Sequence, residues 1–480
     1  MRVALPLDGG GTEKKDPSRP RYWKAENHVD MESGLRVENW MKPIRHLVLG
    51  HADKNKTTVV NLTHEAGTAI LRYVEEVKMF GNLRDHDMRK AHGGKTPSGH
   101  PEEARTDPGF LDSHWKEEVL GKWPSSKVRG PWLKALEALE KELDSAVAKA
   151  KGDSKTGAAF VKLSVRSPKD AVFNRKRFFE ELELRLPQKN NTRLSQEGEG
   201  ANSPPSYDTS KALELSVRIE AIRYASWQSL KCRSGKDAME LLLRSERVYL
   251  DVLQHELFIK GDKTREFNLN VHVSPFVESF DPALEFRGFV ANHRRTAITA
   301  YSPFVFDQRI VKSKDKIWKK IDEVWSEAES KLEMKDYSID FCLSPDLESC
   351  SIVEINAFLP PLAGCGLFDY NDEGDRKLML EGNREFEFRI KSTPLVEQDF
   401  VKERKDETTG KTTKMIMKPA PPHVMLFAEG IQNRTATSPT WAPTVDYASY
   451  FDTSGAGAMA VQQSTSRMRQ QQPTNLCACI

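Results

Sequence analysis

Residues 337–356 constrain the fold more than any other part of the chain, because they predict one β-hairpin that carries a metal site. Two runs of branched and aromatic residues lie on either side of a polar turn centred on Leu347. If the hairpin folds symmetrically about this residue, Asp340 lies opposite Glu354, and Asn356 shares their face. Cross-strand neighbours lie about 4.5–5.5 Å apart at Cβ, so the two carboxylates would repel each other without a cation. Hard oxygen ligands of this kind favour Mg²⁺ that also holds phosphate oxygens, and the alternative is that both acids face solvent.

Composition excludes several classes of protein. The 480 residues are 30% charged and 38% hydrophobic, and the formal net charge of +2 argues against direct binding of nucleic acid. No run of about 18 apolar residues indicates a membrane span. The 6 cysteines lack paired spacing, which is typical of reduced intracellular thiols, so we expect a cytoplasmic protein. The last four residues loosely fit a prenylation box, and membrane attachment would require prenylation of Cys477; a disordered tail is the alternative.

Changes in composition divide the chain into five parts. We expect a disordered arm at 1–35, an N-terminal α/β region at 36–150 with a long loop at 84–130, a central region at 151–270 with a low-complexity insert at 187–210, a C-terminal region at 271–392, and a mostly disordered tail at 393–480. In that tail only residues 423–428 have the composition of an ordered segment.

Periodicity and turn residues predict the elements. Strands are expected at 46–50, 57–62, 158–164, 238–243 and 268–273, a hairpin at 284–300 that turns at Asn292 and His293, and helices at 67–80, 131–146, 169–186, 212–229 and 317–332.

Cationic side chains upstream of the hairpin suit a phosphate ligand. Lys162 alternates with apolar residues in its strand, and burying a lysine costs free energy unless an anion meets it. Arg287 lies on a central strand, where its fork could hold phosphate or a carboxylate. The apolar run at 241–245 reads as a strand whose end, Leu243-Arg244-Ser245, offers backbone groups to the edge of adenine. The alternatives are a strand with one solvent-facing side for Lys162, an ion pair with the neighbours of Glu285 for Arg287, and an ordinary strand end for residues 241–245.

Four motifs in this order resemble the cell division cycle protein 123 family, and the similarity spans about residues 130–390. They are Gly157–Ala171, Leu241–Ser245, Glu285–Val290 with Ala297–Thr299, and Ile339-Asp340 with Val353–Asn356; Gly366–Tyr370 resembles the family's ending. The chain departs from the family at Glu354, where Asp is usual, at Ala357, where Pro is usual, and at Val165, where Trp is usual.

The resemblance implies an α+β, ATP-grasp-like fold in which two lobes close on Mg-ATP, with disordered N- and C-terminal tails. By the same resemblance, the cofactors are ATP and Mg²⁺. Phosphates are held by Lys162, Arg244 and Arg287, the cleft is shaped by Lys169 and Asp170, and Mg²⁺ is bound by Asp340, Glu354 and Asn356. The family's best-known member is an ATP-binding assembly chaperone, so the implied partner is the γ subunit of eukaryotic translation initiation factor two.

Three hypotheses of function follow, and the sequence identifies no catalytic residue. In the first, nucleotide-dependent lobe closure docks an initiation-factor subunit. In the second, the chain is a carbon–nitrogen ligase that forms an acylphosphate on a peptide or protein, with Arg294 and Arg295 contributing to an acceptor pocket. In the third, the chain is an interaction module that binds no nucleotide.

Overall fold

The described part of the chain is discontinuous. The computed structural model describes residues 36–51, 57–74, 115–117, 126–152, 154, 156–174, 177–186, 209–261, 264–358, 364–370, 372–381, 386–395, 401–405, 412–416 and 428. The expected arm at 1–35 lies outside these residues, as do most of the loop at 84–130, of the insert at 187–210 and of the tail at 393–480. Over the described ranges, no helix is long and apolar enough to cross a membrane.

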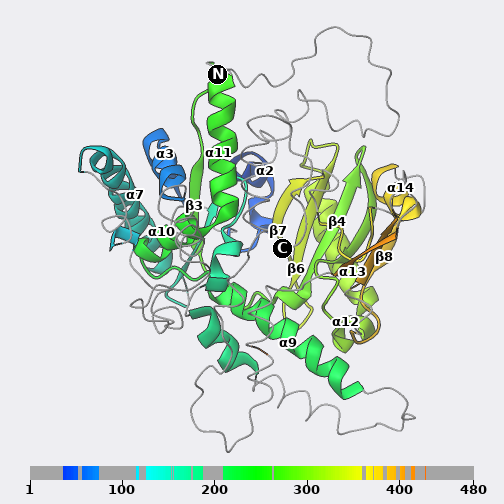
Figure 1. Cartoon of the computed structure of the whole chain (residues 1–480). Coiled ribbons are helices and arrows are strands. Elements are labelled where there is room, and N and C mark those ends of the chain that lie inside the picture. The colour runs from blue at the N-terminus through cyan, green and yellow to red at the C-terminus, as the bar shows by residue number, and fades with distance from the viewer. Residues whose placement is uncertain are drawn as a thin grey trace, which may run out of the picture.

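A three-stranded antiparallel sheet forms the first of two main cores. Its strands β1 (Thr58–Asn61), β3 (Asn270–Pro275) and β2 (Ala159–Leu163) lie in the order β1-β3-β2. Apolar residues of β2 and β3 are fully buried in a hydrophobic cluster with helices α3, α7, α10 and α11. These helices gather around β3 in Figure 1. The bounds are α3 (His64–Arg72), α7 (Ser126–Gly152), α10 (Gly235–Arg244) and α11 (Glu246–Gly261).

A five-stranded sheet forms the second core, in the order β7-β6-β4-β5-β8. The strands are β4 (Glu285–Ala291), β5 (Arg294–Ala300), β6 (Tyr337–Leu343), β7 (Cys350–Ala357) and β8 (Glu387–Arg389). Neighbours pair antiparallel except β5 and β8, which are parallel.

Helices cover both faces of this sheet. The apolar residues of α13 (Lys314–Glu329) and α2 (Val37–Ile44) pack on one face, where Trp325 is fully buried. On the other face, α14 (Glu373–Glu381) packs on Phe289 and Ala297. Helix α2 lies between the two sheets in Figure 1, and α9 (Thr209–Gln228) runs below both of them. The remaining elements are α12 (Gln308–Lys312) and the antiparallel pair β9 (Val401–Lys405) and β10 (Thr412–Ile416).

Most of the expected elements are present, and the two hairpins are confirmed. Asp340 pairs with Glu354 across β6 and β7, with a register shift directly after Asp340, and Leu347 at the turn has a positive φ of 61°. Asn292 and His293 both have positive φ, which is the backbone of a tight two-residue hairpin loop. The overall class is mixed α+β, as expected.

Two expected strands are wrong. Residues 238–243 lie in helix α10, which begins after Ser234, whose side chain accepts a hydrogen bond from the backbone N–H of Asp237. Residues 45–47 form a 3₁₀ turn, and only Val48 makes a single bridge, to Ile352. Helix α7 begins at Ser126, five residues before the predicted start, and α11 and the β9–β10 pair were not anticipated.

Candidate functional site

Lys162 and Glu354 connect the two sheets. Lys162 belongs to β2 of the three-stranded sheet, where its neighbours Val161 and Leu163 are fully buried in the first core. Because side chains alternate along a strand, Lys162 points away from that core. Its Nζ donates a hydrogen bond of 2.7 Å to Oε2 of Glu354 on β7 of the five-stranded sheet. Each of the two side chains is only 11% exposed, so the ion pair is largely shielded from water.

Asp340 is held by the neighbouring strand. Asp340 is the cross-strand partner of Arg287. The Nε and Nη2 of Arg287 each donate a hydrogen bond of 2.7 Å, one to each carboxylate oxygen of Asp340. The Nδ2 of Asn356 donates to Oδ2 of Asp340 over 3.2 Å. A further Arg287 nitrogen, Nη1, donates to the carbonyl oxygen of Gly364 over 3.2 Å. Asp340, Glu354, Asn356 and Arg287 therefore come together on one face of the sheet. The sequence predicts this for the three residues of the hairpin, and the structure adds Arg287.

Burial and neighbouring charges shift the pKa values of these groups. Burial raises the pKa of Asp340, and the Arg287 guanidinium opposes that shift. Burial acts in the same sense on Glu354, but the cations Lys162 and Lys169 overcome it and hold the pKa of Glu354 well below its usual value. Burial disfavours the charge on Arg287, yet the Asp340 carboxylate raises the pKa of Arg287 far above its usual value. Charged groups of both signs are therefore buried together in this cluster of Asp340, Glu354 and Arg287.

Tyr301 is a member of the site that the sequence did not indicate. Lys169, the first residue of a 3₁₀ helix at Lys169–Asn174, donates a hydrogen bond of 2.5 Å from Nζ to the Tyr301 hydroxyl. The guanidinium of Arg287 lies 4.7 Å from the centre of the Tyr301 ring, and that of Arg223, on α9, lies 5.5 Å from it. Arg223 also pairs with Glu285, at 3.3 Å. Burial raises the pKa of Glu285 to about 7, although Arg223 opposes the shift.

Asp170 and Ser245 position the start of α11. The Ser245 Oγ donates to Oδ1 of Asp170 over 2.6 Å and accepts from the backbone N–H of Val248 over 3.1 Å. The other oxygen of Asp170 accepts from the backbone N–H of Arg247 over 3.1 Å. The charge of Arg247 also helps to lower the pKa of Glu354. Asp170 and Ser245 thus fix the turn that carries Arg247, a cation that sequence reasoning missed.

The strand expected to offer its backbone to adenine at 243–245 is not formed. Leu243 and Arg244 end helix α10, and Ser245 follows the helix in an extended conformation, so the contact with the nucleotide stays a prediction. Leu243 is fully buried in the first hydrophobic core. Its side chain therefore packs among apolar residues, and its backbone belongs to a helix.

Three oxygen-bearing side chains of the cluster are the candidate ligands for Mg²⁺. Among the described residues, no group of three or more His, Cys, Asp and Glu side chains is arranged to hold a metal, so the candidate set has two carboxylates and one amide. Asp340 and Glu354 face each other across the hairpin, and Asn356 lies beside Asp340. Mg²⁺ usually takes one or two carboxylates from a protein and completes its shell with water and phosphate oxygens. In the structure, Arg287 and the Asn356 Nδ2 donate hydrogen bonds to Asp340, and Lys162 donates to Glu354, so Mg²⁺ binding by these side chains stays a prediction.

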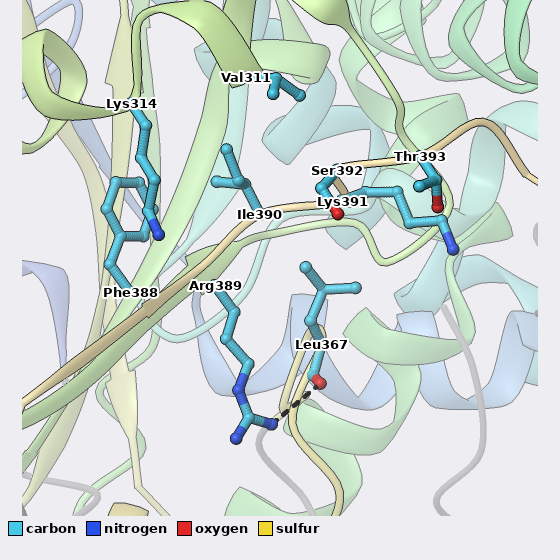
Figure 2. A pocket seen from close by; sticks show the side chains of 9 residues that line it. All are labelled: Val311, Lys314, Leu367, Phe388, Arg389, Ile390, Lys391, Ser392 and Thr393. Atoms are coloured by element: carbon cyan, nitrogen blue, oxygen red, sulfur yellow. Dashed lines mark hydrogen bonds between the residues drawn. The ribbon is translucent and has the colours of Figure 1, made fainter.

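The larger of two described cavities is not lined by Asp340 or Glu354. It has a volume of about 430 Å³ and is lined mainly by the end of β8 and the residues that follow it. Figure 2 shows Lys314 beside Phe388 on one side of this cavity and Lys391 on the other. Arg389 points down from it and donates to the carbonyl oxygen of Leu367 over 3.5 Å. The candidate site is therefore defined by its charged side chains and their contacts, not by this cavity.

Part of the chain matches a known protein family. Residues 221–414 match the model of the D123 family. A solved structure of Cdc123 from Schizosaccharomyces pombe is 16% identical, with a TM-score of 0.41, and the match covers 76% of this chain and 98% of that one. A C-terminally truncated form of the same protein is 17% identical, with a TM-score of 0.42 and the same coverage. No curated protein matches the sequence. The family model thus confirms the predicted resemblance over residues 221–414, which include three of the four motifs.

Proposed function

From the premise that this chain is a divergent relative of the D123 family, we propose that it binds Mg-ATP between its two sheets and assists the assembly of a translation initiation factor. One observation supports this most directly. Lys162 of the three-stranded sheet meets Glu354 of the five-stranded sheet, and Asp340, Asn356 and Arg287 lie beside them. Carboxylates for a metal and cations for phosphate thus converge from two sheets, as in an ATP-grasp protein, where two lobes close on the nucleotide.

Each residue has a separate task in this proposal. Asp340, Glu354 and Asn356 would hold Mg²⁺, which when bound supplies positive charge beside the phosphate oxygens. Lys162 and Arg287 would turn from the carboxylates toward the phosphate groups and orient them. Because their present partners are buried carboxylates, both cations are already dehydrated and close to the place where the phosphates would lie.

Binding between the sheets would favour one arrangement of the two lobes. A ligand shifts such an equilibrium by its difference in affinity for the two states. Contacts from Lys162 on one sheet and Asp340 on the other can be made together only when the sheets are close. The surface offered to an initiation-factor subunit would then depend on nucleotide, which is what an ATP-dependent assembly factor requires.

Calorimetric titration tests the nucleotide site. Wild-type protein should bind Mg-ATP, and Asp340→Asn should weaken binding at least about tenfold, since each factor of ten corresponds to about 1.4 kcal/mol. Asp322→Asn is the matched control, because Asp322 is a half-exposed carboxylate that also pairs with an arginine, Arg295. Thermal unfolding without ligand shows whether either variant is merely unfolded. Equal affinity in Asp340→Asn and wild type would refute the Mg-ATP site and favour a nucleotide-free interaction module.

A pull-down from eukaryotic cell extract tests the partner. The proposal expects the γ subunit of translation initiation factor two to be recovered with ATP and Mg²⁺, and to be reduced when Asp340→Asn replaces the wild type. The control omits nucleotide and adds a chelator. Recovery of no initiation-factor subunit under either condition would remove the assembly role and leave the nucleotide site standing.

Turnover of ATP distinguishes the ligase alternative from the assembly role. One residue considered for an acceptor pocket, Arg295, is engaged elsewhere, because it makes ion pairs with Asp322 and Glu329 on α13. That arrangement holds the β4–β5 hairpin against the helix and removes Arg295 as a candidate for the acceptor pocket. Release of ADP that depends on added peptide would nevertheless favour the ligase, whereas stoichiometric binding without turnover supports the proposal.

A further inference from the structure

Three cations from three separate elements meet at the ring of Tyr301. Lys169 comes from the 3₁₀ helix after β2, Arg223 from α9, and Arg287 from β4. Their charged groups lie 5.0, 5.5 and 4.7 Å from the ring centre, in the same order. Tyr301 directly follows β5. Its backbone N–H donates a hydrogen bond of 2.8 Å to the carbonyl oxygen of Glu285, which fixes the position of the backbone from which the ring extends.

Such a gathering of like charges needs a cause. Cations repel one another, and the repulsion is stronger in a partly buried place than in water. The face of an aromatic ring carries negative charge density that attracts a cation within about 6 Å of its centre, and the guanidinium groups of Arg223 and Arg287 meet that limit. Lys169 is held differently, by the hydrogen bond from its Nζ to the Tyr301 hydroxyl. The ring and hydroxyl of Tyr301, together with the carboxylates Asp340 and Glu285, therefore offset part of the repulsion and keep the cations together.

The charges of the three cations are not equally balanced. Arg287 is paired with Asp340, and Arg223 with Glu285. Within the described part of the chain, no carboxylate lies within ion-pair distance of Lys169, and the Tyr301 hydroxyl holds its Nζ at 2.5 Å. Lys162 adds a fourth cation close by, since both lysines act on Glu354. The cluster thus contains a lysine whose charge is suited to an incoming anion.

We propose that Tyr301 is a positioning residue for polyphosphate: it holds Lys169, Arg223 and Arg287 side by side, so that the affinity of the site rises with the number of phosphate groups on the ligand. This inference rests on the proposed nucleotide site and names what that site discriminates. Each added phosphate brings further negative charge to the held cations, whereas the nucleoside part of the ligand gains nothing from them. Loss of the ring should therefore lower the affinity for ATP more than that for ADP, and the affinity for ADP more than that for AMP.

Titration of one set of variants with AMP, ADP, ATP and inorganic tripolyphosphate, all with Mg²⁺, tests the inference. Tyr301→Leu should weaken the binding of ATP and of tripolyphosphate about tenfold or more, and the binding of AMP less than about twofold. Tyr301→Phe keeps the ring beside the two guanidinium groups but removes the hydroxyl that holds Lys169, so it should show an intermediate loss, about threefold for ATP. Tyr224→Leu is the matched control, because it removes a ring that Arg185 contacts at 3.8 Å, and it should behave as wild type.

The outcomes separate the two proposals. Suppose that wild type binds ATP, and that Tyr301→Leu either lowers the affinities for ATP and AMP equally or changes neither affinity. The positioning role is then refuted and the nucleotide site stands. If wild type binds none of the four ligands, the proposed function fails. Should Tyr301→Leu not fold, Lys169→Met carries the test, because it removes the cation without touching the ring. That variant should show the same ordering of losses, and equal losses for ATP and AMP would overturn the inference.

Discussion

At the scale of single residues, the Lys162–Glu354 pair has consequences for stability. Removing one partner of a buried pair leaves an unpaired charge, which typically costs about 3–5 kcal/mol. Lys169 and Arg247 also act on Glu354, so we expect Lys162→Met to cost near the lower end, about 3 kcal/mol. Lys162→Met combined with Glu354→Gln should cost less than the sum of the single changes, with a coupling energy on the order of 1–3 kcal/mol. Urea unfolding measures all three variants, and strictly additive losses would mean that the pair does not exist in solution.

Glu285 should make stability fall as pH rises. Burial raises its pKa from 4.5 to about 7 in the folded chain, with Arg223 opposing. Between these two values the unfolded chain has lost the proton and the folded chain still holds it. Folding is therefore disfavoured progressively, by on the order of 3 kcal/mol, as pH rises through this window.

Glu285→Gln provides the measurement of that effect, because glutamine cannot ionise. The thermal midpoint of wild type minus that of Glu285→Gln should decline between about pH 5 and pH 7.5, and level off outside the window. A difference that stays constant with pH would show that Glu285 titrates normally. The neighbouring Asp340 is present in both proteins, so its own titration largely cancels.

The sequence predicts those site residues whose neighbours are local. Asp340 and Glu354 belong to one hairpin, so alternation and turn composition suffice to bring them together. Tyr301 and Arg223 meet only because α9 crosses to the end of β5, a contact between residues 78 positions apart for which no periodic signal exists. Residues 241–245 were misplaced for a different reason: a short apolar run fits a buried strand and a buried helix equally well.

At the scale of elements, the packing of α13 on β4 depends on Gly288. A Cβ placed on Gly288 would lie 2.4 Å from the Trp325 ring, whose side chain is fully buried. Alternation in β4 puts Gly288 on the face opposite Arg287, and only a residue without a side chain lets the indole approach the strand. The glycine is thus a requirement of helix–sheet packing.

Gly288→Ala should consequently destabilise the chain by about 1–3 kcal/mol, the usual cost of overpacking a core. Gly261→Ala is the control, since a Cβ there meets nothing within 4 Å, and it should be neutral or slightly stabilising. Denaturant midpoints of both variants measure the difference. A Gly288→Ala protein as stable as wild type would show that Trp325 is not seated against β4.

At the scale of the whole molecule, α2 joins the two cores. Its apolar residues Val37 and Trp40 are buried against the five-stranded sheet. On the same helix, Glu38 accepts hydrogen bonds of 2.7 Å from Ser164 Oγ and from Asn270 Nδ2, which belong to the other sheet's side of the molecule. No local pattern predicts this link, because the partners are 126 and 232 positions apart in sequence.

Glu38→Ala should therefore uncouple the two halves. Each half has a hydrophobic core of its own, so separate unfolding is possible once the connections weaken. We expect calorimetric unfolding of wild type as one transition, and that of Glu38→Ala as two resolved transitions or one clearly broadened transition. Lys42→Ala, an exposed change on the same helix, should keep the wild-type shape. An unbroadened single transition in Glu38→Ala would show that Lys162–Glu354 and the backbone contact from Val37 to Ser164 hold the halves together without Glu38.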